Sequence, residues 1–174
     1  KKTNPEQFNP QDQIRSYLDA HKDEHFNFEQ EPHYVVSSGS LLLDTEMSGG
    51  IRPGILRASG VSEGGKTSCA LSFARNFQDT VENGMVVYIK SEGRLSAEMV
   101  ERSGVNTSED KWFVYKSNIF ESVLQLMREL IMNNPTDCRY FFIIDSMDAM
   151  VPKKDLEKGF DDPDKVAGGS VLSS

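Results

Sequence analysis

The sequence predicts an α/β fold, in which a mainly parallel β-sheet is flanked by helices. Apolar, strand-like segments alternate with segments of helical periodicity along most of the chain. A glycine-rich motif stands between a strand candidate and a helix candidate, in the order that a phosphate-binding loop requires. An aspartate follows the last apolar segment, and parallel sheets bind ligands at the carboxyl ends of their strands. We therefore expect a ligand site at that edge of the sheet.

The first 33 residues are predicted to form a short N-terminal helix and a linker, and residues 34–174 to form the core. Asn9 followed by Pro10 is typical of a helix start, because asparagine caps helices and proline suits the first helical position. The helix is expected to reach about Lys22. Its apolar stripe is thin and needs a partner to bury it; the stripe consists of Ile14, Tyr17 and Leu18.

The core is predicted to begin with a short strand at residues 34–36 and a short helix at 41–44. A turn-rich connection leads to a strand at 54–59, directly before the glycine-rich motif. The next strand, at 85–90, is almost entirely apolar, as a buried parallel strand is. A helix is expected from Ser96 until Gly104 stops it.

The second half of the core continues the alternation. A third strand is predicted at residues 111–115, and a strong amphipathic helix follows. Asn118 is expected to cap that helix, with Glu121 at the capping-box position. Pro135 ends the helix, and a fourth strand at 140–144 leads to Asp145.

The glycine-rich motif fits the P-loop pattern G-x-x-x-x-G-K-[ST]. Glycines let the backbone wrap around phosphate oxygens, and the helix that follows favours anions at its N-terminus. Lys66 would reach the β- and γ-phosphates, and the Thr67 hydroxyl would hold Mg²⁺. An ordinary glycine-rich turn is the alternative, but the strand–loop–helix order favours a P-loop NTPase. The expected nucleotide-binding residues are Gly60, Val61, Ser62, Glu63, Gly64, Gly65, Lys66, Thr67 and Ser68.

Two carboxylates complete the expected site. Asp145 ends an apolar strand like a Walker B acid, where it would orient a water on the Mg²⁺ held by Thr67. A capping role in the following turn is its alternative. Glu92 follows the strand at 85–90, and its carboxylate could accept a proton from water that attacks the γ-phosphorus. By position alone, a solvated loop glutamate fits Glu92 equally well.

Four blocks of the sequence resemble RecA-type DNA recombinases, and the divergence and acidic balance are most like phage recombinases of the UvsX type. The blocks occur in the family's order with similar spacing; they are residues 36–44, 60–67, 88–92 and 143–153. The resemblance covers about residues 35–160. It implies a RecA-like ATPase core that forms helical filaments on single-stranded DNA, for homologous pairing with double-stranded DNA, strand exchange and DNA repair.

The resemblance also implies roles for single residues. ATP and Mg²⁺ would be the ligands, Lys66 and Glu92 the catalytic residues, and Thr67 and Asp145 the metal site. A loop at about 157–169 corresponds to the family's first DNA-binding loop. The lysines that would meet DNA phosphates are Lys153, Lys154, Lys158 and Lys165, although nearby acidic residues also fit a solvated charged loop.

Further partners follow from the same resemblance. The N-terminal helix would contact a neighbouring subunit of a homo-oligomeric filament, and recombination mediators and single-strand-binding proteins are possible partners. Two positions depart from the family: Met99 replaces the aromatic platform for adenine, and Lys90 stands where an acid is common. The chain stops at Ser174, before the family's second DNA-binding loop. We therefore expect a core that is incomplete at its C-terminal end and a fragment that binds nucleotide poorly.

Bulk properties limit the alternatives. A net charge of −8 argues against gripping nucleic acid by a generally basic surface. Two cysteines give neither a disulfide framework nor a metal-binding spacing. No apolar run reaches membrane-spanning length and the start lacks a signal core, so a cytoplasmic protein without membrane partners is expected. Another RecA-fold ATPase, such as a hexameric helicase or a KaiC-like regulatory protein, and a non-enzymatic nucleotide-binding module remain alternatives.

Overall fold

The computed structural model describes residues 9–25, 34–93 and 95–157, and the chain divides into two units, Lys1–His33 and Tyr34–Ser174. The first unit contains helix α1 (Pro10–Ala20) and the short 3-10 helix η2 (Lys22–Glu24). The Asn9 side chain accepts a hydrogen bond from the Gln11 amide at 3.0 Å, which confirms the predicted cap. Ile14 and Tyr17 on the apolar stripe of α1 are both more than half exposed.

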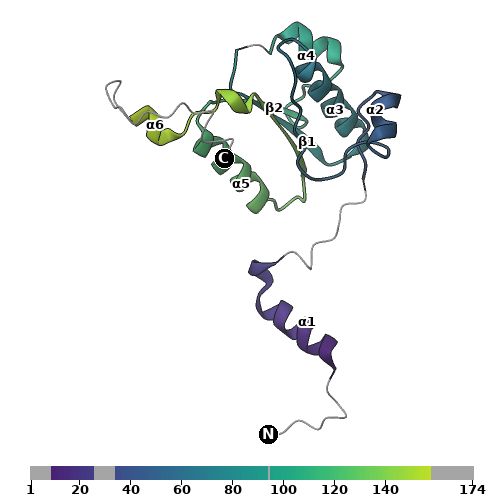
Figure 1. Cartoon of the computed structure of the whole chain (residues 1–174), viewed down its shortest axis with the longest axis vertical. Coiled ribbons are helices and arrows are strands. Elements are labelled where there is room, and N and C mark those ends of the chain that lie inside the picture. The colour runs from purple at the N-terminus through teal and green to yellow at the C-terminus, as the bar shows by residue number, and fades with distance from the viewer. Residues whose placement is uncertain (1–8, 26–33, 94, 158–174) are drawn as a thin grey trace. The chain divides into compact units, whose positions relative to one another are not determined.

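The second unit is built on three parallel strands in the order β2-β1-β3 (Figure 1). The strands are β1 (Gly84–Lys90), β2 (Trp112–Lys116) and β3 (Arg139–Asp145). In the β1–β3 pair, Tyr88 lies opposite Ile143 and Lys90 opposite Asp145. Both strands therefore end at one edge of the sheet, and the predicted parallel sheet is confirmed.

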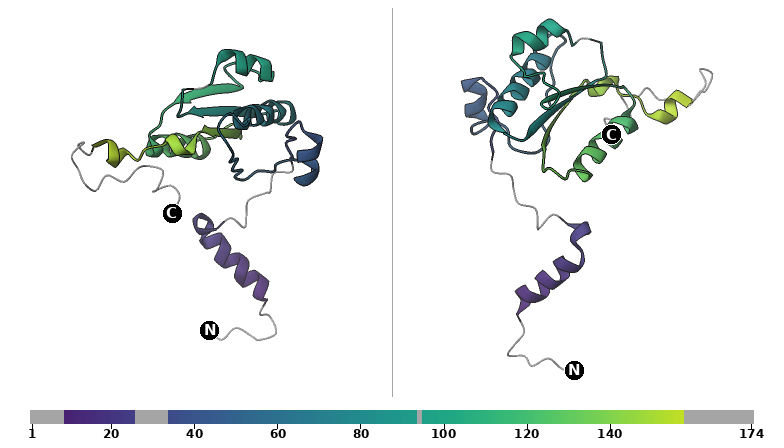
Figure 2. Two further views of the ribbon diagram at one scale, coloured as in Figure 1. Left: turned by 45° about the horizontal axis from the view of Figure 1, so that its top comes forward. Right: turned by 180° about the vertical axis from the view of Figure 1, so that it is seen from behind.

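Helices cover both faces of this sheet (Figure 2). Helices α3 (Lys66–Thr80) and α4 (Ala97–Ser103) share one apolar cluster with Val86 and Tyr88 of β1. The alternate β1 residues, Val87 and Ile89, pack with α5 (Phe120–Met132) in a second cluster. Because side chains of a strand alternate between faces, a central strand covered on both sides must be apolar throughout.

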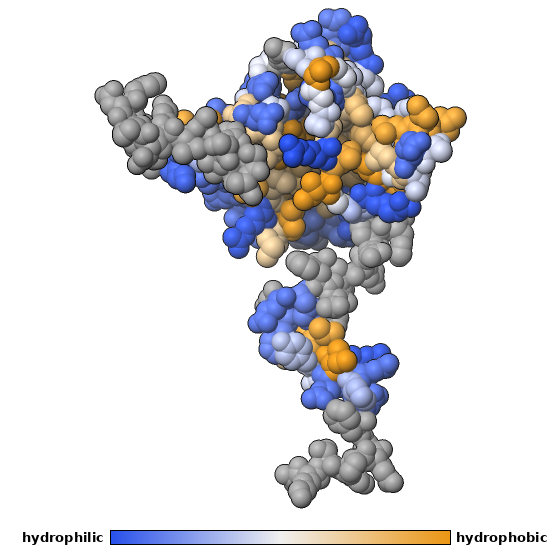
Figure 3. Space-filling model, in the orientation of Figure 1, coloured by the Kyte–Doolittle hydropathy of each residue, from blue (hydrophilic) through white to orange (hydrophobic). Residues whose placement is uncertain are grey.

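The remaining elements are short: α2 (Leu41–Glu46), the 3-10 helix η3 (Met147–Ala149) and α6 (Lys153–Glu157). Two predicted helix ends of α4 are confirmed: Ser96 caps its start, and Gly104, with φ of 73°, ends it in the left-handed conformation. Apolar surface is visible on the α2 side of the core (Figure 3), where Leu41 and Leu42 are exposed. Within the described ranges, no helix has both the length and the apolar character needed to cross a bilayer.

The predicted strand at residues 54–59 is wrong. The segment is irregular, and its apolar residues Ile55 and Leu56 are 102% and 54% exposed. A strand needs a neighbour to pair its backbone N–H and C=O groups, and no described strand lies beside this segment. The predicted strand at 34–36 is likewise reduced to one antiparallel bridge between Val36 and Ile51.

The predicted cap of α5 is also wrong. The helix begins at Phe120 and has Ile119, not Asn118, at its N-cap position. The cause is a parallel bridge between Ile119 and Val151, in which the Val151 amide donates to the Asn118 carbonyl at 2.7 Å. This pairing holds Ile119 in an extended conformation. Glu121 does not close a capping box but accepts a hydrogen bond from the Lys153 amide at 2.8 Å, which links α5 to α6.

Candidate nucleotide-binding site

The glycine-rich loop leads directly into α3, as predicted. Gly65 occupies the N-cap position of that helix with φ of 85°, a conformation that glycine adopts without steric cost. Among the described residues no side chain caps this helix, and its first turn contains no acid. The first backbone N–H groups of α3 thus have no side-chain acceptor among the described residues, and an anion would find donors there.

Lys66 lies across its own loop. Its ammonium group donates to the carbonyl oxygens of Gly60 at 3.0 Å and Val61 at 2.8 Å. These bonds hold the charged end of Lys66 over the loop. A phosphate placed in the loop would compete with the two carbonyls for the same ammonium protons.

The two nucleotide motifs meet at Thr67 and Asp145. The Thr67 hydroxyl donates to Asp145 Oδ2 at 2.7 Å, although 78 positions separate the residues in sequence. Thr67 stands in the first turn of α3, and Asp145 at the carboxyl end of β3. A hydroxyl and a carboxylate side by side are the oxygen ligands that suit Mg²⁺. The side chains therefore fit the metal that the sequence implies.

A third hydroxyl reaches the same carboxylate. Tyr88 of β1 donates to Asp145 Oδ2 at 2.5 Å and is only 1% exposed. Burial raises the pKa of Tyr88 strongly, and the hydrogen bond to Asp145 raises it further. The Tyr88 hydroxyl is therefore protonated at neutral pH and acts as the donor. Sequence reasoning missed Tyr88; the signal was a tyrosine in an otherwise apolar strand, whose buried hydroxyl needs a partner.

Ser146, the residue after Asp145, forms a hydrogen bond with Glu92. The Ser146 hydroxyl donates to Glu92 Oε1 at 2.6 Å. Ser91 ties the two strand ends together, since its amide donates to the Asp145 carbonyl at 3.1 Å and its hydroxyl to the Ser146 carbonyl at 2.7 Å. The peptide bond between Asp145 and Ser146 is cis. The Glu92 side chain remains exposed, open to a substrate or a water.

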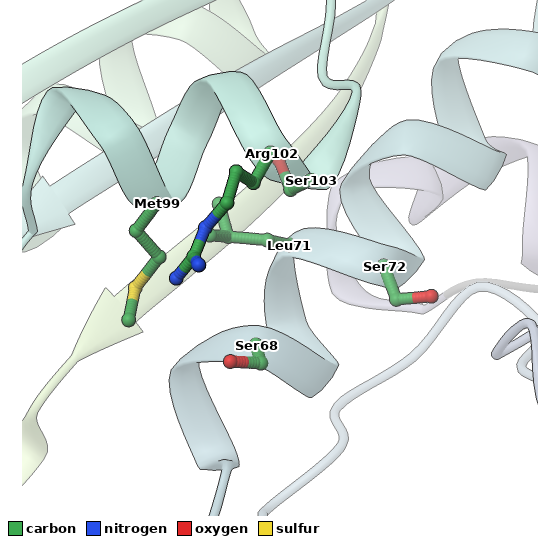
Figure 4. A pocket seen from close by; sticks show the side chains of 6 residues that line it. All are labelled: Ser68, Leu71, Ser72, Met99, Arg102 and Ser103. Carbon is green, nitrogen blue, oxygen red and sulfur yellow. The ribbon is translucent and has the colours of Figure 1, made fainter.

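A cleft of about 330 Å³ lies between α3 and α4 (Figure 4). Ser68, the last residue of the predicted nucleotide-binding set, is one of its lining residues. Met99, which replaces the family's aromatic platform, is another. Arg102 adds a positive charge to the cleft. The full lining is Ser68, Leu71, Ser72, Met99, Arg102 and Ser103.

The family-like segment at residues 36–44 fixes the chain against α3. Asp44 accepts hydrogen bonds from the Ser37 hydroxyl at 2.5 Å, the Ser38 amide at 2.7 Å and the Ser38 hydroxyl at 2.6 Å. In turn, Ser72 and Asn76 of α3 donate to the carbonyls of Ser38 and Ser37. The bonds from Ser37, then those from Ser38, lower the pKa of Asp44. These hydrogen bonds anchor the segment at residues 36–44 to α3.

The candidate DNA-binding lysines are only partly described. Lys153 and Lys154 stand in α6 and are exposed. Lys158 and Lys165 lie outside the described residues, as does nearly all of the loop predicted at 157–169. The structure therefore shows two exposed cations in the helix that precedes that loop.

Together, the parallel sheet, the loop before α3 and the Thr67–Asp145 contact define a P-loop protein of the α/β class. Residues 25–173 match the RecA N-terminal domain family, and the chain belongs to that family. "Protein RecA" of Petrotoga mobilis (strain DSM 10674 / SJ95) is 32% identical over 130 residues, 74% of this chain and 33% of the relative. "Protein RecA" of Lactococcus lactis subsp. cremoris (strain MG1363) is 34% identical over 125 residues, 71% of this chain and 30% of the relative. The chain spans about a third of the length of these relatives.

Proposed function

We propose that this chain is the nucleotide-binding core of an ATP-dependent DNA recombinase. The hydrogen bond between Thr67 and Asp145 carries the proposal, because it joins the two halves of a Mg²⁺–nucleotide site at one sheet edge. Membership of the RecA N-terminal domain family supports it. The protein would form helical filaments on single-stranded DNA, pair them with homologous double-stranded DNA, and act in strand exchange and repair. Its acidic balance and divergence favour a phage enzyme of the UvsX type.

Each group of residues would have its own role in ATP hydrolysis. The loop amides at 60–65 and the N-terminus of α3 bind the phosphates, and Lys66 leaves its loop carbonyls to reach them. Mg²⁺, when bound at Thr67 and Asp145, supplies positive charge that offsets the charge developing on the phosphates. Glu92, held by Ser146, accepts the proton of the attacking water.

DNA binding would depend on local cations, since the chain as a whole carries a net charge of −8. The exposed Lys153 and Lys154, with Lys158 and Lys165 further along, would contact the DNA backbone. The helix in residues 1–33 would contact the next subunit of the filament, consistent with its exposed apolar stripe. Recombination mediators and single-strand-binding proteins would assist loading on DNA.

The decisive experiment compares the natural protein, in full, with a Lys66→Ala variant. We expect ATP hydrolysis that single-stranded DNA stimulates, together with joint-molecule formation, and we expect the variant to lose both activities. An exposed lysine outside the loop provides the control: Lys116→Ala should hydrolyse ATP normally. Duplex unwinding without joint molecules would instead indicate a helicase. Unchanged partner binding without any turnover would indicate a non-enzymatic module.

A further inference from the structure

Tyr88 is a polar residue in the most protected position of the sheet. It stands in the central strand β1, where its neighbours Val87 and Ile89 are as fully buried as it is. Its ring packs in the apolar cluster shared with α3, at 5.7 Å between ring centroids from Trp112. A phenylalanine would fill this space equally well. The hydroxyl therefore has a purpose other than packing, and its only acceptor among the described residues is Asp145.

The strand register brings the hydroxyl to Asp145. Tyr88 lies opposite Ile143 on β3, and Asp145 follows two residues later, on the same face of the sheet. A tyrosine side chain is long enough to reach this diagonal neighbour. The contact is therefore built into the pairing of β1 with β3.

The two hydroxyls leave Asp145 with a defined free oxygen. Thr67 and Tyr88 both donate to Oδ2, and within the described part of the chain Oδ1 accepts no hydrogen bond. Two donors on one oxygen fix the plane of the carboxylate, so that Oδ1 keeps one direction. Groups that hold a metal-binding side chain in this way tune the affinity of the site for the metal.

We propose that Tyr88 is a positioning residue that acts through Asp145 to set the Mg²⁺ requirement of nucleotide binding. The inference rests on the proposed function, in which Thr67 and Asp145 hold the metal. Tyr88 would contact neither nucleotide nor metal; it orients the carboxylate that would hold a water on the metal. Removing the hydroxyl alone should thus weaken metal-dependent binding and leave metal-free binding as it is.

The test is Tyr88→Phe in the natural protein. Calorimetry measures how tightly the variant binds a non-hydrolysable ATP analogue at a series of Mg²⁺ concentrations. Loss of a group that orients a metal ligand typically costs about 10- to 100-fold in metal affinity. Because Asp145 would act through a metal-bound water, we expect the half-saturating Mg²⁺ concentration to rise roughly tenfold, at the lower end of that range. Affinity for the analogue in EDTA should be unchanged. Tyr115→Phe removes the same atom on the α5 face of β2, and should change neither value.

Two further measurements separate positioning from packing. In a double-mutant cycle, Tyr88→Phe should add nothing to Asp145→Asn if it acts through that carboxylate. The single tryptophan of the chain, Trp112, reports on the surroundings of Tyr88, and its emission should be the same in Tyr88→Phe as in the unchanged protein.

Each other outcome has a definite meaning. An unchanged Mg²⁺ requirement in Tyr88→Phe, or full additivity with Asp145→Asn, overturns the inference and leaves the proposed function standing. Equal loss of binding with and without Mg²⁺, accompanied by altered Trp112 emission, assigns Tyr88 a packing role and also overturns it. If the unchanged protein binds no Mg²⁺–nucleotide at all, both the inference and the proposed function are overturned.

Discussion

Ser146 donates a hydrogen bond to Glu92 at 2.6 Å, across 54 positions of sequence. The contact exists because β1 and β3 are parallel neighbours whose carboxyl ends meet at one edge. Glu92 follows β1, and Ser146 follows β3. The bond orients an exposed carboxylate beside the Thr67–Asp145 pair, and a general base requires that kind of fixed placement.

We expect Glu92→Gln to retain ATP binding and to slow hydrolysis strongly. Glutamine keeps the shape of the side chain but cannot take up a proton. A positioned general base contributes about 10²- to 10⁴-fold to rate, and the loss of turnover should fall in that range. Steady-state hydrolysis and analogue binding measure the two effects separately. Glu101→Gln, an exposed change on α4, is the control, and near-normal turnover in Glu92→Gln would remove this residue from the mechanism.

Asp145→Asn should weaken the response of nucleotide binding to Mg²⁺. The amide has no negative charge to hold the metal or its waters. If its oxygen accepts the hydrogen bonds of Thr67 and Tyr88, the NH₂ group replaces the free oxygen Oδ1 and cannot hold a cation or accept from its waters. We expect the apparent Mg²⁺ affinity to fall by about 10- to 100-fold, measured by titrating Mg²⁺ against analogue binding. Asp148→Asn changes an exposed aspartate three residues away and should have no such effect. Equal Mg²⁺ titrations for the two variants would contradict the assignment of Asp145.

The fold was predictable where short-range signals decide it. The apolar run of β1, the serine cap and the glycine stop of α4 each depend on neighbouring residues, and each was found from sequence. The segment at 54–59 has the composition of a strand but no partner among the described residues, and composition does not show a missing partner. Asn118 has the composition of a cap, but a bridge to Val151 determines its backbone.

The site was predictable as two separate motifs, but the contacts that connect them were not. The sequence indicated Thr67, Asp145 and Glu92, because each belongs to a pattern with a known chemical reason. It did not indicate that Tyr88 and Ser146 orient the two carboxylates, because those bonds depend on strand register. Once the register is known, alternation along β1 and β3 places Tyr88 and Asp145 on one face.

The Asp44 cluster predicts a pH dependence of stability. The pKa of Asp44 in the folded protein lies below its ordinary value of 3.8, because Ser37 and then Ser38 donate to the ionised carboxylate. A lowered folded-state pKa means that the contribution to stability is complete above about pH 3.8 and is lost as pH falls through the folded-state pKa. Asp44→Asn should therefore lower the urea midpoint at pH 7, and the difference from the unchanged protein should shrink toward pH 3.

Asp79→Asn is the matched control for this prediction. Asp79 is exposed on α3 and forms a 3.8 Å ion pair with Arg75, an arrangement that contributes little to stability. Its urea midpoint should stay close to that of the unchanged protein at both pH values. A destabilisation by Asp44→Asn that is as large at pH 3 as at pH 7 would show that the charge of Asp44 is not what stabilises the segment at 36–44.

The packing of α5 against the sheet can be tested with a pair of isoleucines. Ile89 in β1 is 0% exposed and packs in the cluster formed with α5, whereas Ile131 at the end of α5 is 56% exposed. Truncating a buried isoleucine removes apolar contacts and leaves a cavity, so Ile89→Ala should cost about 2–5 kcal/mol of unfolding free energy. Ile131→Ala should stay within about 0.5 kcal/mol, because more than half of this residue is already exposed to water. Urea unfolding measures both, and equal losses would mean that α5 does not cover β1 as the structure places it.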